Sequence, residues 1–191
     1  MRDGPAVDPD LDLVRRIGAG DQRACAALVD RHLSRIHAVA VRLLGSRTDA
    51  EDVAQEVFLR VWRHAADWRD GEARFSTWLH RVAVNLCHDR LRRRHETTLD
   101  AAGDPASEAP SPGAALQEKA VSARVDAALG RLPERQREAI ALCYYQELSN
   151  MEAAAIMGLS VEALESLLAR GRRRLKEILS GEAADLLGDV S

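Results

Sequence analysis

The sequence has few aromatic residues and few breaks in its helical patterns. Aromatics make up 4% of the 191 residues, whereas 46% are hydrophobic, so the core must be built mainly from Ala, Leu and Val. Glycine and proline are scarce inside the segments with helical periodicity. This combination predicts an all-α protein, and the length allows one domain of ordinary size or two small ones.

Cysteine is also scarce. Cys25, Cys87 and Cys143 are odd in number, far apart and never in a CxxC pair, which indicates reduced thiols rather than a disulfide framework or a zinc module. His80 and His88 flank Cys87, but the helical angle separates Cys87 from His88, so we expect no metal and no cofactor. The lack of a Gly-rich phosphate loop, a metal-ligand motif and a nucleophile elbow argues against an enzyme.

The chain lacks an apolar leader and any apolar run of membrane-spanning length. We therefore expect a cytoplasmic protein without direct membrane insertion. The net charge is -3, which is the wrong sign for a protein that coats DNA unaided. Any contact with DNA would depend on local basic patches and on a partner that supplies most of the phosphate affinity.

Aromatics and arginines are concentrated between Ala50 and His95. This stretch holds five of the seven aromatics, and it closes on four arginines: Phe58, Trp62, Trp68, Phe75 and Trp78, then Arg90, Arg92, Arg93 and Arg94. Such a combination suits a surface that stacks on unpaired bases and neutralises phosphates. The alternatives stay open, because aromatics at helical spacing also build cores and a charge run is also typical of a solvated helix face.

The first part of the chain predicts a frayed tail over Met1–Pro9, then a short helix and a longer one between Leu11 and Leu44, separated by two glycines. Asp21 is the expected N-cap of the longer helix, and Gly45 is expected to end it. The predicted buried stripe of this helix is Leu28, Leu33, Ile36, Ala40 and Leu44.

A further helix, predicted from Asp49 to about Ala66, separates into two faces. The core face contains Val53, Ala54, Val57, Phe58, Val61 and Ala65. The opposite face contains Asp52, Gln55, Glu56, Leu59 and Arg63. An exposed leucine among acids and an amide is typical of a surface that docks on another protein, although a single exposed leucine without a role is the alternative.

The segment Asp67–Arg74 is predicted to be a loop that pivots at Gly71. The next helix is predicted from Phe75 to about Arg94, with Ser76 or Thr77 as its cap. Its buried stripe contains Trp78, Leu79, Val82, Ala83 and Leu86. Its other side presents His80, Arg81, Asn85, His88 and Arg92, a cationic and hydrogen-bonding face without acids, as reading a base edge and holding a phosphate would require.

The stretch from Glu96 to about Leu116 has three prolines and no periodicity. We predict a linker with a random-coil span of about 25 Å and a stretched limit near 70 Å. Two domains follow from it. The second should begin with one helix over Glu118–Gly130 and another that has Pro133 at its first position and runs to about Glu147.

The last two predicted helices form a helix-turn-helix. Ser149 and Glu152 match a capping box for the first, Gly158 ends it, and Ser160 caps the second, which should run to about Leu179. Small Ala154 lies where the helices must approach, and the residues that pack inward are Val161, Leu164 and Leu168. This spacing indicates DNA binding, with an ordinary helical hairpin as the alternative.

Three segments carry a family resemblance: DAEDVAQEVFLRVWR at 49–63, RFSTWLHRVAVNLCHDRLRRR at 74–94 and LPERQREAIALCYYQELSNMEAAAIMGLS at 132–160. In these segments the chain resembles bacterial sigma factors of the extracytoplasmic-function (ECF) group. The resemblance implies two small helical domains joined by a flexible acidic linker. The implied parts are a tail with the start of the first helix at 1–20, region 2 at 21–95, the linker at 96–117, region 4 at 118–182 and a tail at 183–191.

The resemblance also implies the binding residues. Those for the beta-prime clamp helices of core RNA polymerase are Asp52, Gln55, Glu56, Leu59 and Arg63, and the beta flap is a second implied contact. Those for the minus-ten element are Trp68, Arg74, Phe75, Arg81, Asn85, His88, Arg92 and Arg93. Those for the minus-thirty-five element are Ser166, Arg170, Arg172 and Arg173. The chain departs from most relatives at two positions of the last helix where basic residues are usual, Glu165 and Leu167, and Glu162 adds another acid near the end that should enter the groove.

We therefore expect a sigma factor that directs core RNA polymerase to a restricted set of promoters and is held inactive by an anti-sigma factor, often membrane-bound. The alternative is a sigma-like interaction protein that titrates an anti-sigma factor without binding DNA. A free helix-turn-helix repressor would need a dimerisation element and a more basic surface, neither of which the sequence presents.

Overall fold

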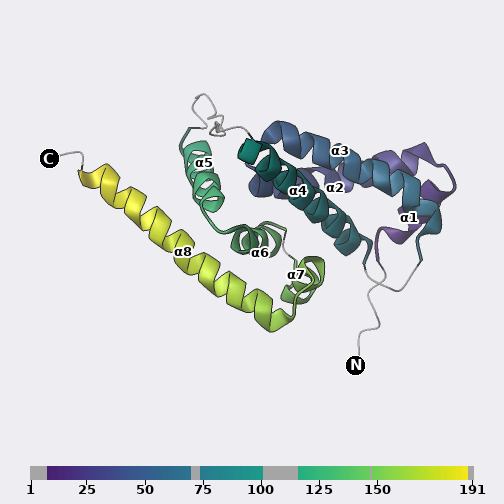
Figure 1. Ribbon diagram of the computed structural model, residues 1–191. Coiled ribbons are helices and arrows are strands. Elements are labelled where there is room, and N and C mark those ends of the chain that lie inside the picture. Colours follow the sequence, from purple (N-terminus) through teal and green to yellow (C-terminus); the bar gives the residue numbers. More distant parts are fainter. Residues whose placement is uncertain (1–7, 70–73, 101–115, 147, 189–191) are drawn as a thin grey trace.

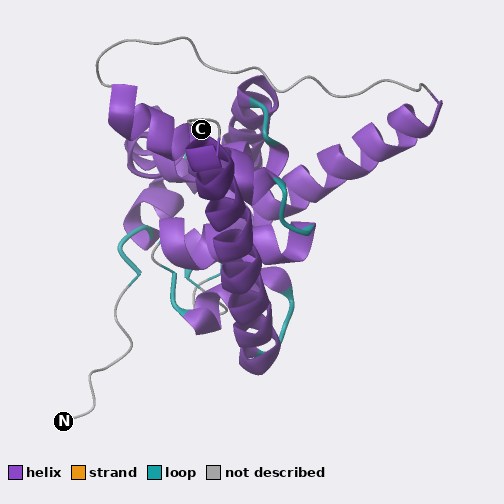
Figure 2. Ribbon diagram, turned by 90° about the vertical axis from the view of Figure 1, so that its left-hand side faces the viewer, coloured by secondary structure: helices purple, strands orange, loops and turns teal. Residues whose placement is uncertain are grey.

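The computed structural model describes residues 8–69, 74–100, 116–146 and 148–188, and every regular element in these ranges is a helix (Figures 1 and 2). The all-α prediction is confirmed. The elements are α1 (Leu11–Gly18), α2 (Gln22–Leu44), α3 (Arg47–His64), the 3-10 turn η1 (Ala65–Asp67), α4 (Phe75–Asp100), α5 (Leu116–Gly130), α6 (Glu134–Tyr145), α7 (Asn150–Met157) and α8 (Val161–Gly188).

The first unit is built on α2, which packs against α1, α3 and α4. The side chain of Asp21 accepts hydrogen bonds from the backbone N–H groups of the next turn at 2.8 and 3.2 Å, and Gly45 ends the helix at a φ of +65°, so both predicted boundaries are confirmed. The predicted core face of α3 is buried throughout. Leu33 is a wrong core prediction, because its side chain is 42% exposed and lines a groove between α2 and α3.

The start of α4 is capped by a residue far away in the sequence. The helix begins at Phe75, so Ser76 and Thr77 lie inside its first turn and the prediction that either caps it is wrong. The N–H of Phe75 instead donates to Oδ2 of Asp8 at 2.5 Å. Asp8 therefore belongs to the folded unit and not to a frayed tail. Residues 1–7 and the predicted pivot Gly71 lie outside the described residues.

A buried carboxylate secures the N-terminal segment to α2. Asp10 is 1% exposed, and its two oxygens accept hydrogen bonds from Arg31 Nη1 at 2.6 Å and His32 Nε2 at 2.8 Å. Burial alone would raise the pKa of Asp10, but the hydrogen bonds and charges of these two partners together lower it below its ordinary value. The contact therefore fixes the segment that contains Asp8, the cap of α4, and the start of α1 against α2.

The basic run at the end of α4 is divided between structural and exposed arginines. Arg90 pairs with Asp49 at 2.9 Å and with Asp52 at 2.5 Å, while Arg94 pairs with Asp49 and donates to the carbonyl of Leu44 at 3.1 Å. These two arginines fasten α4 to α2 and α3. The helix then continues to Asp100, so the prediction that the linker begins at Glu96 is wrong, and residues 101–115 lie outside the described part.

The second unit ends in the predicted helix-turn-helix. Ser149 and Glu152 form the capping box of α7, and Gly158 follows α7 at a φ of +65°, where a left-handed backbone favours glycine. Oγ of Ser160 accepts from the N–H of Ala163 at 3.2 Å and caps α8. Leu164 and Leu168 are buried as predicted.

Three boundaries in the second unit differ from the sequence predictions. Pro133 is the N-cap of α6 rather than its first helical residue. Helix α8 extends to Gly188, well past the predicted end near Leu179, because no Gly-Pro signal stops it there. Gly171 is buried where α8 crosses α6, and an added Cβ would lie 2.9 Å from Cδ1 of Ile140. A larger residue would force these two helices apart.

We predict that Asp10→Asn lowers the free energy of unfolding by about 1.5–3 kcal/mol, because two charge-assisted hydrogen bonds to a buried carboxylate are lost. Since the pKa of Asp10 is depressed in the folded state, its contribution is present above the pKa of the unfolded chain and disappears as the pH falls through the lower folded value. The difference between wild type and variant in urea denaturation should therefore shrink on acidification.

Asp12→Asn is the matched control for that experiment. The Asp12 side chain is 80% exposed and lies 3.6 Å from Arg16, so its removal should leave stability nearly unchanged. Equal stability of the two variants at neutral pH would contradict a structural role for the Asp10 cluster.

Candidate functional site

Three aromatic side chains lie together beside the start of α4. The ring centroids of Trp68, Phe75 and Trp78 lie 5.1 to 5.5 Å apart, and the pairs that include Trp68 are edge-to-face. Phe75 is only 1% exposed, so the expectation that it contacts promoter DNA is not met and the core alternative holds for this residue. Trp68 and Trp78 are half-buried.

The polar face of α4 is largely present as predicted. Arg81, Asn85 and Arg92 are exposed and His88 is half-buried. His80 is a correction, because it is 2% exposed and its Nδ1 and Nε2 lie 2.8 Å from the carbonyl of Ser76 and 3.4 Å from Oε1 of Gln146. Burial lowers the pKa of His80 and favours a neutral imidazole that has no access to DNA.

The second unit of the chain lies directly on this polar face. Figure 1 shows α6 and α7 between α4 and α8, and α7 packs against α4 while α6 packs against α2. Nη2 of Arg81 donates to the carbonyl oxygen of Ala155 at 2.6 Å. His88 Nε2 lies 3.2 Å from Oε2 of Glu138 in α6. No local sequence pattern predicts this contact between distant segments.

Glu138 is the most buried acid of the contact. It is fully buried, and its Oε2 also accepts from Nη1 of Arg135 at 3.2 Å. The hydrogen bond to Glu138 is the main cause that raises the pKa of His88, with the negative charge of Glu134 adding to it. The attraction between protonated His88 and Glu138 is therefore complete below the ordinary histidine pKa. It is lost as the pH rises through the raised pKa of His88 and the imidazole loses its proton.

The predicted docking face of α3 is exposed. Asp52, Gln55, Leu59 and Arg63 all reach solvent, and Leu59 is 44% exposed. Glu56 is half-buried and accepts from Nε of Arg60 at 3.0 Å. The helix thus presents a leucine within a charged and hydrogen-bonding surface, as predicted.

A groove beside this face was not predicted. Leu33 and Trp62, 42% and 41% exposed, line it together with Leu59, and its volume is about 750 Å³. Trp62 follows Leu59 by three residues and so lies on the same side of α3, which is the signal that could have identified it. Leu33 is part of the apolar stripe of α2 and was therefore expected in the core. The periodicity of α2 does not show that α3 leaves this part of the stripe uncovered.

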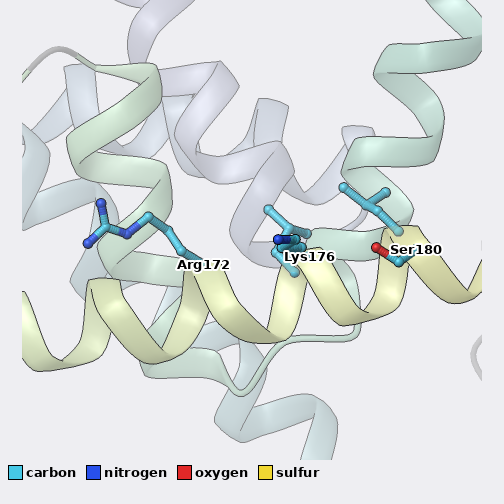
Figure 3. A pocket seen from close by; sticks show the side chains of 5 residues that line it. Arg172, Lys176 and Ser180 are labelled. Carbon is cyan, nitrogen blue, oxygen red and sulfur yellow. The ribbon is translucent and has the colours of Figure 1, made fainter.

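The exposed surface of α8 carries most of the residues predicted to read the minus-thirty-five element. Ser166, Arg170 and Arg173 are exposed and share one face at i, i+4 and i+7. Arg172 lies apart from them, because its Nη1 donates to the hydroxyl of Tyr144 in α6 at 3.1 Å. Figure 3 shows Arg172, Lys176 and Ser180 along one side of α8, where they line a shallow hollow.

The two acids of α8 and the leucine that were expected to affect reading of the minus-thirty-five element have structural roles of their own. Glu162 lies in the first turn of α8, where hydrogen bonds from its own backbone N–H and from Ser160 lower its pKa and where a negative charge favours the helix. Oε1 of Glu165 accepts from Nδ2 of Asn150 at 3.2 Å and joins α7 to α8. Leu167 is half-buried against the core.

The described part of the chain lacks the features of several other kinds of site. It contains no group of three or more His, Cys, Asp or Glu side chains arranged to hold a metal ion. Burial raises the pKa of the Cys87 thiol to about 12, so this cysteine is protonated at neutral pH. None of the helices described is long and apolar enough to span a membrane.

Comparison with known proteins identifies two segments that match protein families. Residues 28–97 match the family Sigma-70 region 2, and residues 122–175 match the family Sigma-70, region 4. The first range lies within the span from α2 to α4, and the second lies within the span from α5 to α8.

Individual relatives match most of the length of this chain. The ECF RNA polymerase sigma factor SigE of Mycolicibacterium smegmatis is 34% identical over 173 residues, 87% of this chain and 66% of SigE, so the chain spans just under two thirds of that relative. RNA polymerase sigma factor CnrH of Cupriavidus metallidurans is 35% identical over 92% of this chain and 97% of CnrH.

Solved structures agree with the sequence relatives. CnrH in complex with the cytosolic domain of CnrY superposes with a TM-score of 0.70 at 29% identity, covering 90% of this chain and 97% of that one. Sigma factor RpoE in complex with the anti-sigma factor NepR from Bartonella quintana also gives 0.70 at 26% identity, covering 81% and 96%. The matched relatives are transcription initiation factors and not enzymes. The chain belongs to the sigma-70 family of RNA polymerase sigma factors, in its ECF group.

Proposed function

We propose that this protein binds core RNA polymerase and directs it to a restricted set of promoters under the control of an anti-sigma factor. One observation carries the proposal: each of the two helical units presents a separate exposed face whose residue types suit its expected partner. The proposed domains are region 2 at 21–95 and region 4 at 118–182, connected by the linker that begins after α4. The protein would act in the cytoplasm with polymerase.

The exposed face of α3 is the proposed contact with the beta-prime clamp helices. Leu59 supplies an apolar centre, and Asp52, Gln55, Glu56 and Arg63 supply the polar rim. An apolar residue within a polar rim is the usual composition of a protein interface that forms and dissociates. The beta flap is the proposed second contact and would involve the region 4 unit.

The polar face of α4 is the proposed contact with the minus-ten element. Arg81, Asn85 and His88 would meet bases or phosphates, together with Arg92 and Arg93 further along the helix and Arg74 and Trp68 beside its start. Flipping a base costs a few kcal/mol, and stacking or a fitted pocket returns roughly 1–3 kcal/mol per base. Binding energy could therefore open the strands without ATP once polymerase holds the duplex.

The exposed face of α8 is the proposed reader of the minus-thirty-five element. Ser166, Arg170 and Arg173 lie together on it, and Arg172 would join them on leaving Tyr144. Arginine suits guanine edges and phosphates, and the helix is the second of a helix-turn-helix. Glu165 faces α7 through Asn150, which supports a helix that binds DNA despite its acids.

Control by an anti-sigma factor is supported by the relatives. RpoE was solved in complex with the anti-sigma factor NepR, and CnrH in complex with the cytosolic domain of CnrY. We extend this kind of partner to the present chain, and an anti-sigma factor anchored in the membrane would hold the protein there until a signal arrives.

In vitro transcription tests the proposal. Core RNA polymerase, with and without this protein, is given fragmented genomic DNA and the transcript starts are sequenced. New starts that share an upstream motif are expected and would supply the promoter. A folded preparation that produces no new starts would contradict the assignment and favour an interaction protein that only titrates an anti-sigma factor.

Leu59→Asp should abolish co-purification with core polymerase while leaving the helical circular dichroism spectrum intact, because the change buries a charge in the apolar centre of the interface. Ala27→Asp places the same charge on an exposed position of α2 and should leave co-purification unaffected. Retention of the Leu59 variant on core polymerase would rule out the α3 face as the docking surface.

Arg170→Ala and Arg173→Ala should each weaken promoter binding by the holoenzyme by roughly 1–3 kcal/mol, since each removes a cation from the DNA-facing side of α8. Arg124→Ala in α5, an exposed arginine of the same unit, is the control and should leave binding nearly unchanged. If the footprints of both α8 variants match that of the wild type, α8 is not part of the DNA interface.

A further inference from the structure

A carboxylate of the α3 docking face is bound by an arginine of the neighbouring helix. Helices α3 and α4 pack against each other, as Figure 1 shows. Nε of Arg90 in α4 donates to Oδ1 of Asp49 at 2.9 Å, and Nη2 of the same guanidinium donates to Oδ2 of Asp52 at 2.5 Å. Asp49 and Asp52 are one helical turn apart and lie on the same side of α3, so one planar guanidinium bridges them.

The two carboxylates that Arg90 bridges differ in exposure. The Asp49 side chain is 19% exposed and also pairs with Arg94, further along α4. The Asp52 side chain is 53% exposed and belongs to the surface proposed to meet polymerase. The inner carboxylate is thus part of the helix packing, whereas the outer one is presented to a partner.

Glu56, the other acid of the docking face, is bound in a different way. Its partners Arg60 and Arg63 belong to α3 itself and lie 3.0 and 4.0 Å away. Pairs between exposed side chains of one helix are weak and leave both side chains mobile. Asp52 is instead tied to a second helix, through a guanidinium that Asp49 also holds in place. The Asp52 carboxylate is therefore ordered before any partner arrives.

We infer that Arg90 is a positioning residue for the polymerase contact, because it fixes the Asp52 carboxylate in the orientation in which the clamp helices bind it. The inference rests on the proposed function, in which Asp52 is part of the polar rim around Leu59. A side chain that is ordered before binding loses less conformational entropy in the complex. For one side chain this gain corresponds to roughly two- to tenfold in affinity.

Two arginine variants separate positioning from the fastening of helices. Arg90→Met keeps an apolar stem of similar length and removes the donors that hold Asp52. Arg94→Met is the matched control, because it removes the same charge from the same end of α4. It loses the bonds to Asp49 and to the carbonyl of Leu44 instead of the bond to Asp52.

The measurement is the affinity of the full chain for core RNA polymerase, from titration of the fluorescently labelled protein with core enzyme. Urea denaturation of each variant gives the folded fraction, for which the affinity is corrected. Arg90→Met should bind core polymerase roughly two- to tenfold more weakly than wild type. Arg94→Met should bind as wild type does, although both substitutions remove ion pairs between helices and lower stability.

A third substitution, Asp52→Ala, shows whether Arg90 acts through Asp52. It should itself weaken the binding of core polymerase, since it removes part of the polar rim. Adding Arg90→Met to Asp52→Ala should cause no further loss of affinity, because no carboxylate is left to position. A residue that touched polymerase directly, or only stabilised the fold, would not give this result.

Wild-type affinity of Arg90→Met would overturn the inference. An equal loss in Arg94→Met would also overturn it, since both arginines would then act only through helix packing. Additive losses in the double variant would show that Arg90 acts independently of Asp52, with the same consequence.

The outcome for Asp52 separates the inference from the proposed function. Wild-type affinity of Asp52→Ala, in a protein that transcribes with core polymerase, would refute the positioning role and leave the sigma function intact. Failure of the wild type itself to bind core polymerase would refute the proposed function and the inference with it.

Discussion

The fully buried carboxylate of Glu138 connects the two halves of this protein. It bonds to Arg135, which in turn donates to the carbonyl of Met157 at the end of α7, and across the domain contact it bonds to His88 of α4. One acid thus braces the helix-turn-helix and fixes it to the region 2 unit. The position of the DNA-reading helices relative to α4 depends on this group and on the weaker pairs around it.

A net charge of -3 is consistent with such an arrangement. Acids of the second unit compensate cations of the first, so the free chain presents little uncompensated positive charge and has little tendency to bind DNA at random. Arginines such as Arg90 and Arg94 are used within the region 2 unit to fasten its helices. Polymerase, which is proposed to dock on α3, would then supply the remaining affinity for DNA.

The sequence predicted the helices and their caps where the signals are local. Asp21, Gly45, the Ser149–Glu152 capping box and Gly158 act within one turn of the backbone, and all are confirmed. The exposed face of α3 was predicted because helical angle alone separates it from the core. The family resemblance identified the expected partners, because the periodicity of a helix predicts an exposed face but not what binds to it.

Contacts between distant segments were beyond such reasoning. The cap of α4 comes from Asp8, sixty-seven positions earlier, and the burial of His80 results from Gln146 in the other unit. Phe75 was expected to contact DNA but is buried, and Leu33 was expected in the core but is exposed. Both differences have the same cause, because burial depends on which helix packs over a residue and not on its spacing in the sequence. The domain contact is polar, and a polar helix face looks the same in sequence whether it meets water, DNA or another helix.

The most direct test measures the separation of the two units in the free chain and in the initiation complex. Spin labels are attached to unnatural amino acids that replace two exposed residues, Arg47 of α3 and Arg174 of α8. The distance between the labels is then measured by pulsed electron paramagnetic resonance. A short distance in the free chain and a longer one with core polymerase and promoter DNA is the predicted result. The same distance in both states would contradict the proposal that the α4 face contacts promoter DNA, because the region 4 unit lies on that face in the free chain.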